Sequence, residues 1–96
     1  MHTVYDLYTE SQPALAATVG LFFDSFTLIP AVGYWRGVAE QTTVIRLILP
    51  ATYANRLKLA GLIEDIRVGF TQECVLLSAT PADVQFVTAD NPLIQD

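Results

Sequence analysis

The sequence predicts an α+β fold in which two helices pack on one face of an antiparallel sheet. A chain of 96 residues accommodates one small hydrophobic core, so we expect a single domain spanning residues 1–96. Apolar residues recur every second position in some segments and at helical spacing in others. These segments follow one another as strand, helix, strand, strand, helix, strand, which predicts the fold.

The first half of the chain begins with a predicted strand and helix. Thr3–Thr9 is rich in β-branched and aromatic residues and predicts a strand. Ser11 is suited to cap a helix, and Pro13 is tolerated in a first helical turn. We expect this helix to run to about Ser25. Its core-facing stripe consists of Leu15, Val19, Phe22 and Phe26.

Two strands that form a hairpin are predicted next. From Phe26 to Tyr34 the apolar period is two, and Pro30 within this segment predicts either an edge strand or a bulge. A turn is expected near Arg36-Gly37-Val38, with a long strand over Val38–Leu49.

The second half of the chain repeats the helix and strand. Ala51–Val68 is predicted to be a helix that Gly69 ends, followed by a strand over Cys74–Ala79. The core-facing stripe of this helix consists of Leu59, Leu62, Ile63 and Ile66. After a turn at residues 80–83, a short fifth strand over Val84–Thr88 and a loose tail over 90–96 are expected.

This order of elements is the βαββαβ order of the ferredoxin-like fold, which leaves one sheet face without helices. Val44, Ile48 and alternate residues of the fourth strand are expected on that face. Hydrophobic residues make up 52% of the chain and charged residues only 16%, which is low for a soluble domain. We therefore expect the open face to be covered by further copies of the chain, in a homodimer or homotrimer.

Charge and residue counts exclude several classes of function. The formal net charge is −5 and the five basic residues are scattered, so duplex nucleic acid is not expected as a partner. With one cysteine and one histidine, Cys74 and His2, the chain has too few ligands for a zinc site and cannot form an intrachain disulfide. We expect Cys74 to be buried in a strand, no cofactor, and a cytoplasmic location.

The segment Ala14–Trp35 contains one charged residue, Asp24, and its hydropathy raises the question of a membrane helix. Asp24 lies in its middle, Pro30 follows, and the apolar period changes along it. We therefore expect no membrane association. Asp6 and Glu10 precede the segment without any basic residue, so a signal peptide is not expected either.

One dense group of residues is a candidate binding site. Trp35 can stack on a flat ring, Arg36 can bind a phosphate or carboxylate, and Glu40 can accept hydrogen bonds. Tyr34 lies beside them. The same residue types also anchor oligomer interfaces, so a structural role remains open.

A second polar pair, Gln72 and Glu73, lies where the second helix passes into the fourth strand. Polar side chains at such a connection either contact a ligand or are simply solvated. The six candidate ligand-binding residues are thus Tyr34, Trp35, Arg36, Glu40, Gln72 and Glu73. No catalytic motif is present: there is no glycine-rich phosphate loop, and no Ser, His and Asp in a catalytic order.

Two short motifs resemble an uncharacterised family of small bacterial proteins with a ferredoxin-like fold. The motifs are Gly33-x-Trp35-x-Gly37-x-x-Glu40 and Phe70-x-Gln72-Glu73-x-Val75. The predicted architecture is also similar to that of the PII-like signalling proteins. That resemblance implies trimers that bind small ligands, often nucleotides, between subunits. It places Trp35, Arg36 and Glu40 near the end of the central hairpin, and Gln72 and Glu73 close to a subunit boundary.

Three functions follow as hypotheses. The first is a non-enzymatic homo-oligomer that senses or sequesters a small anionic ligand, such as a nucleotide, between subunits. The second is a protein–protein interaction module or inhibitor that uses the apolar sheet face. The third is a small ferredoxin-like barrel enzyme, for which Arg46 and Glu40 are the candidate residues.

Overall fold

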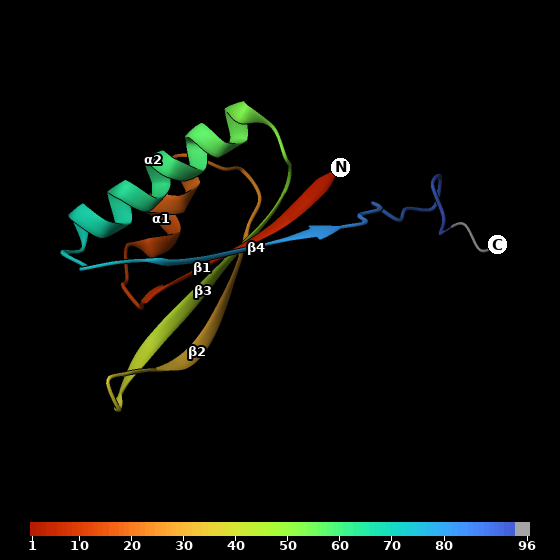
Figure 1. The fold of residues 1–96 in the computed structure, drawn as a ribbon. Helices are drawn as coiled ribbons and strands as arrows, with labels where there is room; N and C mark the ends of the chain where they lie inside the picture. The colour runs from red at the N-terminus through yellow and green to blue at the C-terminus, as the bar shows by residue number, and fades with distance from the viewer. Residues whose placement is uncertain (94–96) are drawn as a thin grey trace.

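The computed structural model describes residues 1–93, which form an α+β fold with one four-stranded antiparallel sheet (Figure 1). The elements in chain order are β1 (His2–Glu10), α1 (Leu15–Gly20), β2 (Thr27–Trp35), β3 (Val38–Pro50), α2 (Tyr53–Gly69) and β4 (Leu76–Ala82). The strand order across the sheet is β2-β3-β1-β4. This arrangement is consistent with the ferredoxin-like fold that the sequence predicts.

Both helices lie on the same side of the sheet (Figure 1). The core between the two layers is built from alternate residues of the central strands and one stripe of each helix. Its buried members are Tyr5, Leu7, Leu15, Val19, Phe23, Ile45, Leu47, Leu59, Leu62 and Ile66. The predicted stripe of α2 is confirmed, with Ile63 partly buried at its margin.

Helix α1 is shorter than predicted. Ser11 does not cap it, because its backbone N–H donates to Gln41 O at 2.9 Å and its hydroxyl pairs with Thr43 Oγ1 at 2.8 Å. These bonds hold Ser11 against β3, and the helix begins four residues later, at Leu15. It ends at Gly20, so Phe22 and Phe26 pack on the core from the connection that follows.

The hairpin of β2 and β3 is confirmed. Trp35 pairs with Val38 across a two-residue turn, in which Arg36 and Gly37 have φ angles of 51° and 79°. Two consecutive positive φ angles are typical of the tight turn that matches the twist of paired strands. Pro30 lies on an edge strand, because β2 pairs only with β3.

The end of the chain differs from the prediction. Strand β4 begins at Leu76, pairs with β1 and continues through Pro81 to Ala82, so the predicted turn at 80–83 is wrong. Proline is tolerated there because β4 is the other edge strand. Within the described residues after β4, 83–93, no fifth strand forms. Of the predicted loose tail, residues 94–96 lie outside the described part of the chain.

The sheet face opposite the helices carries an ion pair at its centre. Asp6 of β1 lies directly opposite Arg46 of β3, and the guanidinium donates to both carboxylate oxygens, at 2.9 and 3.0 Å. Ile48 on this face is 47% exposed, as predicted, but Val44 is only 8% exposed. Tyr8 and Ile29 flank Val44 in register on either side, and such cross-strand neighbours cover a small side chain.

No helix within residues 1–93 is long and apolar enough to cross a membrane.

The ion pair predicts how stability depends on pH. The hydrogen bonds from Arg46 lower the pKa of Asp6 below its ordinary value of 3.8, although partial burial opposes the shift. A lowered carboxyl pKa contributes stability above the ordinary value, and this contribution is lost as the pH falls through the folded-state value. Asp6→Asn should therefore lower the urea midpoint near neutral pH and flatten its decline below about pH 4.

Asp24→Asn is the matched control, because Asp24 is exposed and lies outside the sheet. It should leave both the midpoint and its pH dependence close to those of the wild type. An Asp6→Asn variant with an unchanged midpoint at neutral pH would contradict a stabilising role for the pair.

Candidate functional site

A pocket of ≈ 380 Å³ lies at the end of the sheet where the β2–β3 hairpin, the end of β1 and the α2–β4 connection meet. We call it the hairpin pocket. Its lining residues are Tyr8, Thr9, Glu10, Gly33, Tyr34, Trp35, Glu40, Thr42, Thr71, Gln72, Glu73, Cys74 and Leu76. The volume falls within the range of about 300–1,000 Å³ that is usual for small-molecule sites.

The hairpin supplies one wall of the pocket. Strand β2 ends with Tyr34 and Trp35, which are 74% and 53% exposed. Gly33 lies opposite Glu40 in the register, and a Cβ atom at Gly33 would collide with Thr42 Oγ1. The glycine therefore leaves room for the Thr42 side chain at the pocket wall.

The end of α2 supplies the opposite wall. Thr71 has a φ of 54°, which ends the helix and turns the chain back on itself. The N–H of Thr71 donates to Val68 O at 3.2 Å, and that of Gln72 donates to Arg67 O at 2.7 Å. This is the pattern of a Schellman cap, which usually has glycine at the left-handed position. The left-handed residue is Thr71 rather than the predicted stop, Gly69, which is the last residue of α2.

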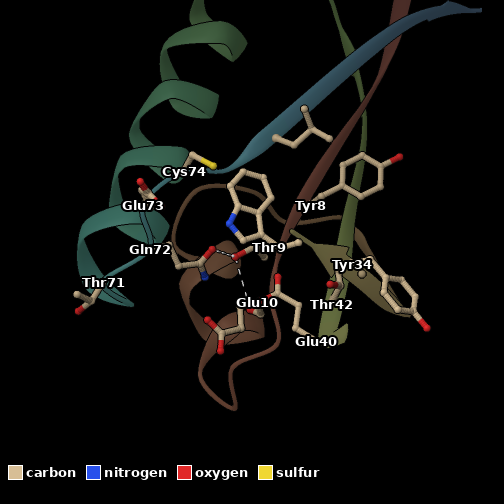
Figure 2. A pocket seen from close by; sticks show the side chains of 13 residues that line it. Tyr8, Thr9, Glu10, Tyr34, Glu40, Thr42, Thr71, Gln72, Glu73 and Cys74 are labelled. Atoms are coloured by element: carbon tan, nitrogen blue, oxygen red, sulfur yellow. Dashed lines mark hydrogen bonds between the residues drawn. The ribbon is translucent and has the colours of Figure 1, made fainter. Parts of the chain in front are cut away.

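A hydrogen bond joins the end of β1 to the α2–β4 connection (Figure 2). Thr9 Oγ1 donates to Gln72 Oε1 at 2.7 Å, and Thr9 itself is 3% exposed. Gln72 Nε2 is buried and has no hydrogen-bond partner among the described residues. Exchanging the oxygen and the nitrogen of this amide would exchange which atom bonds to Thr9, so one of the two polar atoms lacks a partner in either orientation.

The charges of the pocket are all negative. Glu10, Glu40 and Glu73 line it, and its lining contains no lysine, arginine or histidine. Arg36 is not part of the lining. Its guanidinium carbon lies 5.8 Å from the centroid of the Trp35 ring, in a cation–π contact. Within the described residues, no group of three or more His, Cys, Asp or Glu side chains is arranged to hold a metal ion.

The pocket brings together five of the six candidate residues that the sequence nominates, all except Arg36. The sequence reading missed the contribution of β1, namely Tyr8, Thr9 and Glu10. The only local signal was the polar pair Thr9-Glu10 at the end of the strand. The prediction that Cys74 is buried is wrong. Its thiol is free and exposed, because it precedes β4 and lies at the pocket.

Arg46 and Glu40, the pair considered for an enzyme, do not share a site. Both lie on β3, six residues apart, which corresponds to roughly 20 Å along a strand. Arg46 is bound to Asp6 at the centre of the open face, whereas Glu40 lies in the hairpin pocket.

Comparison with known proteins shows the fold alone. No protein-family profile and no curated protein sequence matches the chain. Among solved structures, the chain is similar to a DUF3240 family protein from Shewanella baltica OS155, with a TM-score of 0.65 and 13% sequence identity. The match covers 92% of this chain and 97% of that one.

The Thr9–Gln72 bond makes a prediction that can be tested without a ligand. Thr9→Val removes the hydroxyl and leaves both polar atoms of the Gln72 amide without a partner. This should lower the unfolding free energy by about 1–3 kcal/mol. Adding Gln72→Leu should recover part of this loss, because an apolar pair leaves no polar atom unsatisfied. Urea denaturation of the two single variants and the double variant measures the coupling. Strictly additive effects would contradict a direct bond.

Proposed function

We propose that this chain is a non-enzymatic, homo-oligomeric module that binds a small organic molecule in the hairpin pocket. The observation that carries the proposal is the pocket itself. Segments far apart in the sequence meet there, and they bring aromatic rings, carboxylates and a buried unsatisfied amide around one cavity. A largely apolar cavity with a few convergent polar groups is the usual form of a small-molecule site.

The pocket is open on the sheet face that the helices leave uncovered. Tyr8, Trp35 and Leu76 line it, and they are 37%, 53% and 64% exposed. A second subunit placed on this face would cover these side chains and close the site. This supports the expectation of sites between subunits, which the similarity in architecture to the PII-like proteins also implies.

Two exposed patches of this chain support self-association. The apolar residue Ile48 lies beside the central ion pair on the open face, and β4 has an unpaired edge. Exposed apolar patches and free strand edges are common at subunit contacts. We retain a homodimer and a homotrimer as the two candidate assemblies.

The charges of the lining bear on the class of ligand. A nucleotide or other anion, which the sequence reading favours because of Arg36, would meet three carboxylates unless Arg36 left Trp35 and turned into the pocket. An organic cation with a flat or methylated head would instead meet tyrosine and tryptophan rings together with opposite charges. The lining therefore favours a cation, and anions remain the competing class.

Trp35 is the only tryptophan of the chain, so its fluorescence reports directly on the pocket. We expect ligands from a panel of nucleotides, cyclic nucleotides and organic ammonium compounds to change this emission, and calorimetry to give their affinities. For a cation, Glu40→Gln should weaken binding about tenfold or more, the equivalent of one lost charge contact. For an anion, Arg36→Ala should have that effect.

Asp65→Asn is the matched control, because Asp65 is an exposed acid on α2 outside the pocket lining. It should leave every affinity unchanged. If no compound of either class alters the emission or releases heat, the proposed function is wrong.

The second candidate function is a protein–protein interaction module or inhibitor whose open sheet face docks on a different protein. The observation that favours it is the exposed apolar surface of that face, where Ile48 of β3 and Leu76 of β4 are 47% and 64% exposed. This candidate requires the isolated chain to be a monomer, whereas the first requires a self-associated one.

A further inference from the structure

The residues after β4 form a segment that projects from the body of the molecule. We call residues 83–93 the C-terminal arm; it continues beyond the end of β4 and leads away from both helices (Figure 1). The radius of gyration is 15.2 Å, whereas a compact chain of this length has a value of about 12.5 Å, so the molecule is extended. The arm is one projecting part, and the end of the β2–β3 hairpin is another (Figure 1).

The arm nevertheless has a defined local structure. Thr88 and Asn91 exchange backbone hydrogen bonds of 2.9 and 3.2 Å, which close a tight turn. The Asn91 side chain donates to Phe86 O at 3.1 Å, and the Gln85 side chain donates to Pro92 O at 3.0 Å. Within the described residues, the hydrogen bonds of the arm all join two of its own residues.

The arm also exposes its apolar side chains. Phe86 is 76% exposed, and Val87 and Leu93 are each 57% exposed. A turn that is ordered by its own hydrogen bonds while presenting a phenylalanine to water is suited to bind an apolar surface elsewhere.

A groove of ≈ 550 Å³ between α2 and β4 offers such a surface. Its walls include Leu59 and Ile63 of α2 and Leu77 and Pro81 of β4, with Tyr5 of β1 at its base. It forms because β4 is an edge strand whose helix-facing side α2 covers only in part.

Charge complements the apolar match between arm and groove. Arg56 is the one charged residue in the lining of the groove. The arm contains two acids, Asp83 and Asp90, and no basic residue. Its negative charges therefore suit a groove whose single charge is positive.

The arm does not occupy the groove of its own chain. It leaves the body directly after Pro81 and Ala82, at the end of the groove, and its direction leads away from α2 (Figure 1). To enter the groove of its own chain, the arm would have to reverse direction at residues 83–84. The same groove on a second copy can be reached without this reversal.

We propose that the C-terminal arm of one copy lies in the groove between α2 and β4 of a second copy, with Phe86 among the apolar side chains. In a two-fold pair each copy would donate its arm to the other. The inference rests on the self-association proposed above and is independent of any ligand in the hairpin pocket.

Cross-linking between copies tests the proposal on the full chain. In a Cys74→Ser background, which removes the one native thiol, Phe86→Cys is introduced in one preparation and Ala60→Cys, on the groove wall, in another. The two preparations are mixed and treated with a short bismaleimide. We expect a covalent pair whose peptide map joins the two introduced thiols.

The matched control replaces Ala60→Cys with Val68→Cys, an exposed position on α2 outside the groove lining, and should give no such link. A chain carrying both Phe86→Cys and Ala60→Cys should link between copies; a link closed within one chain would overturn the proposal. If the chain self-associates but the expected link does not form, the proposed placement of the arm is wrong and the proposed function still stands. If the chain is a monomer, both the placement of the arm and the homo-oligomeric part of the proposed function are wrong.

Discussion

The fold depends on one constraint: both helices lie on the same face of a four-stranded sheet. Each central strand therefore has one face against the helices and one face away from them. Leu7 of β1 and Leu47 of β3 are buried under the helices, and Asp6 and Arg46 lie on the opposite face. A one-residue shift in the register would exchange these faces, so the bidentate ion pair and the buried leucines specify the same alignment. The open face is the consequence, and the hairpin pocket lies at one end of it.

The pocket shows how this constraint yields a site. Strand β1 ends between the hairpin and the α2–β4 connection, and the Thr9–Gln72 bond joins segments that are 63 residues apart. The left-handed Thr71 sets the position of Gln72 at the cost of about 1–2 kcal/mol for a residue other than glycine. Backbone strain and an unsatisfied buried polar group recur at functional sites, and both occur at this end of the hairpin pocket.

The sequence predicted the elements whose residues carry a clear period. The order of the six elements, the turn at Arg36-Gly37 and the buried stripe of α2 all follow from local patterns. It failed where distant contacts decide the outcome: Ser11 bonds to β3 instead of capping α1, and pairing with β1 carries β4 through Pro81. For the site, residue type nominated the hairpin, but only the fold could bring Thr9 and Glu10 to it and leave Arg36 outside.

In the proposed assembly, further copies of the chain cover the open face and the arm. Sedimentation equilibrium of the full wild-type chain over a wide range of concentrations tests this most directly. We expect the mass of two or three copies of the 10.5 kDa chain, with a return toward 10.5 kDa only on strong dilution. A mass of 10.5 kDa at every concentration would contradict it.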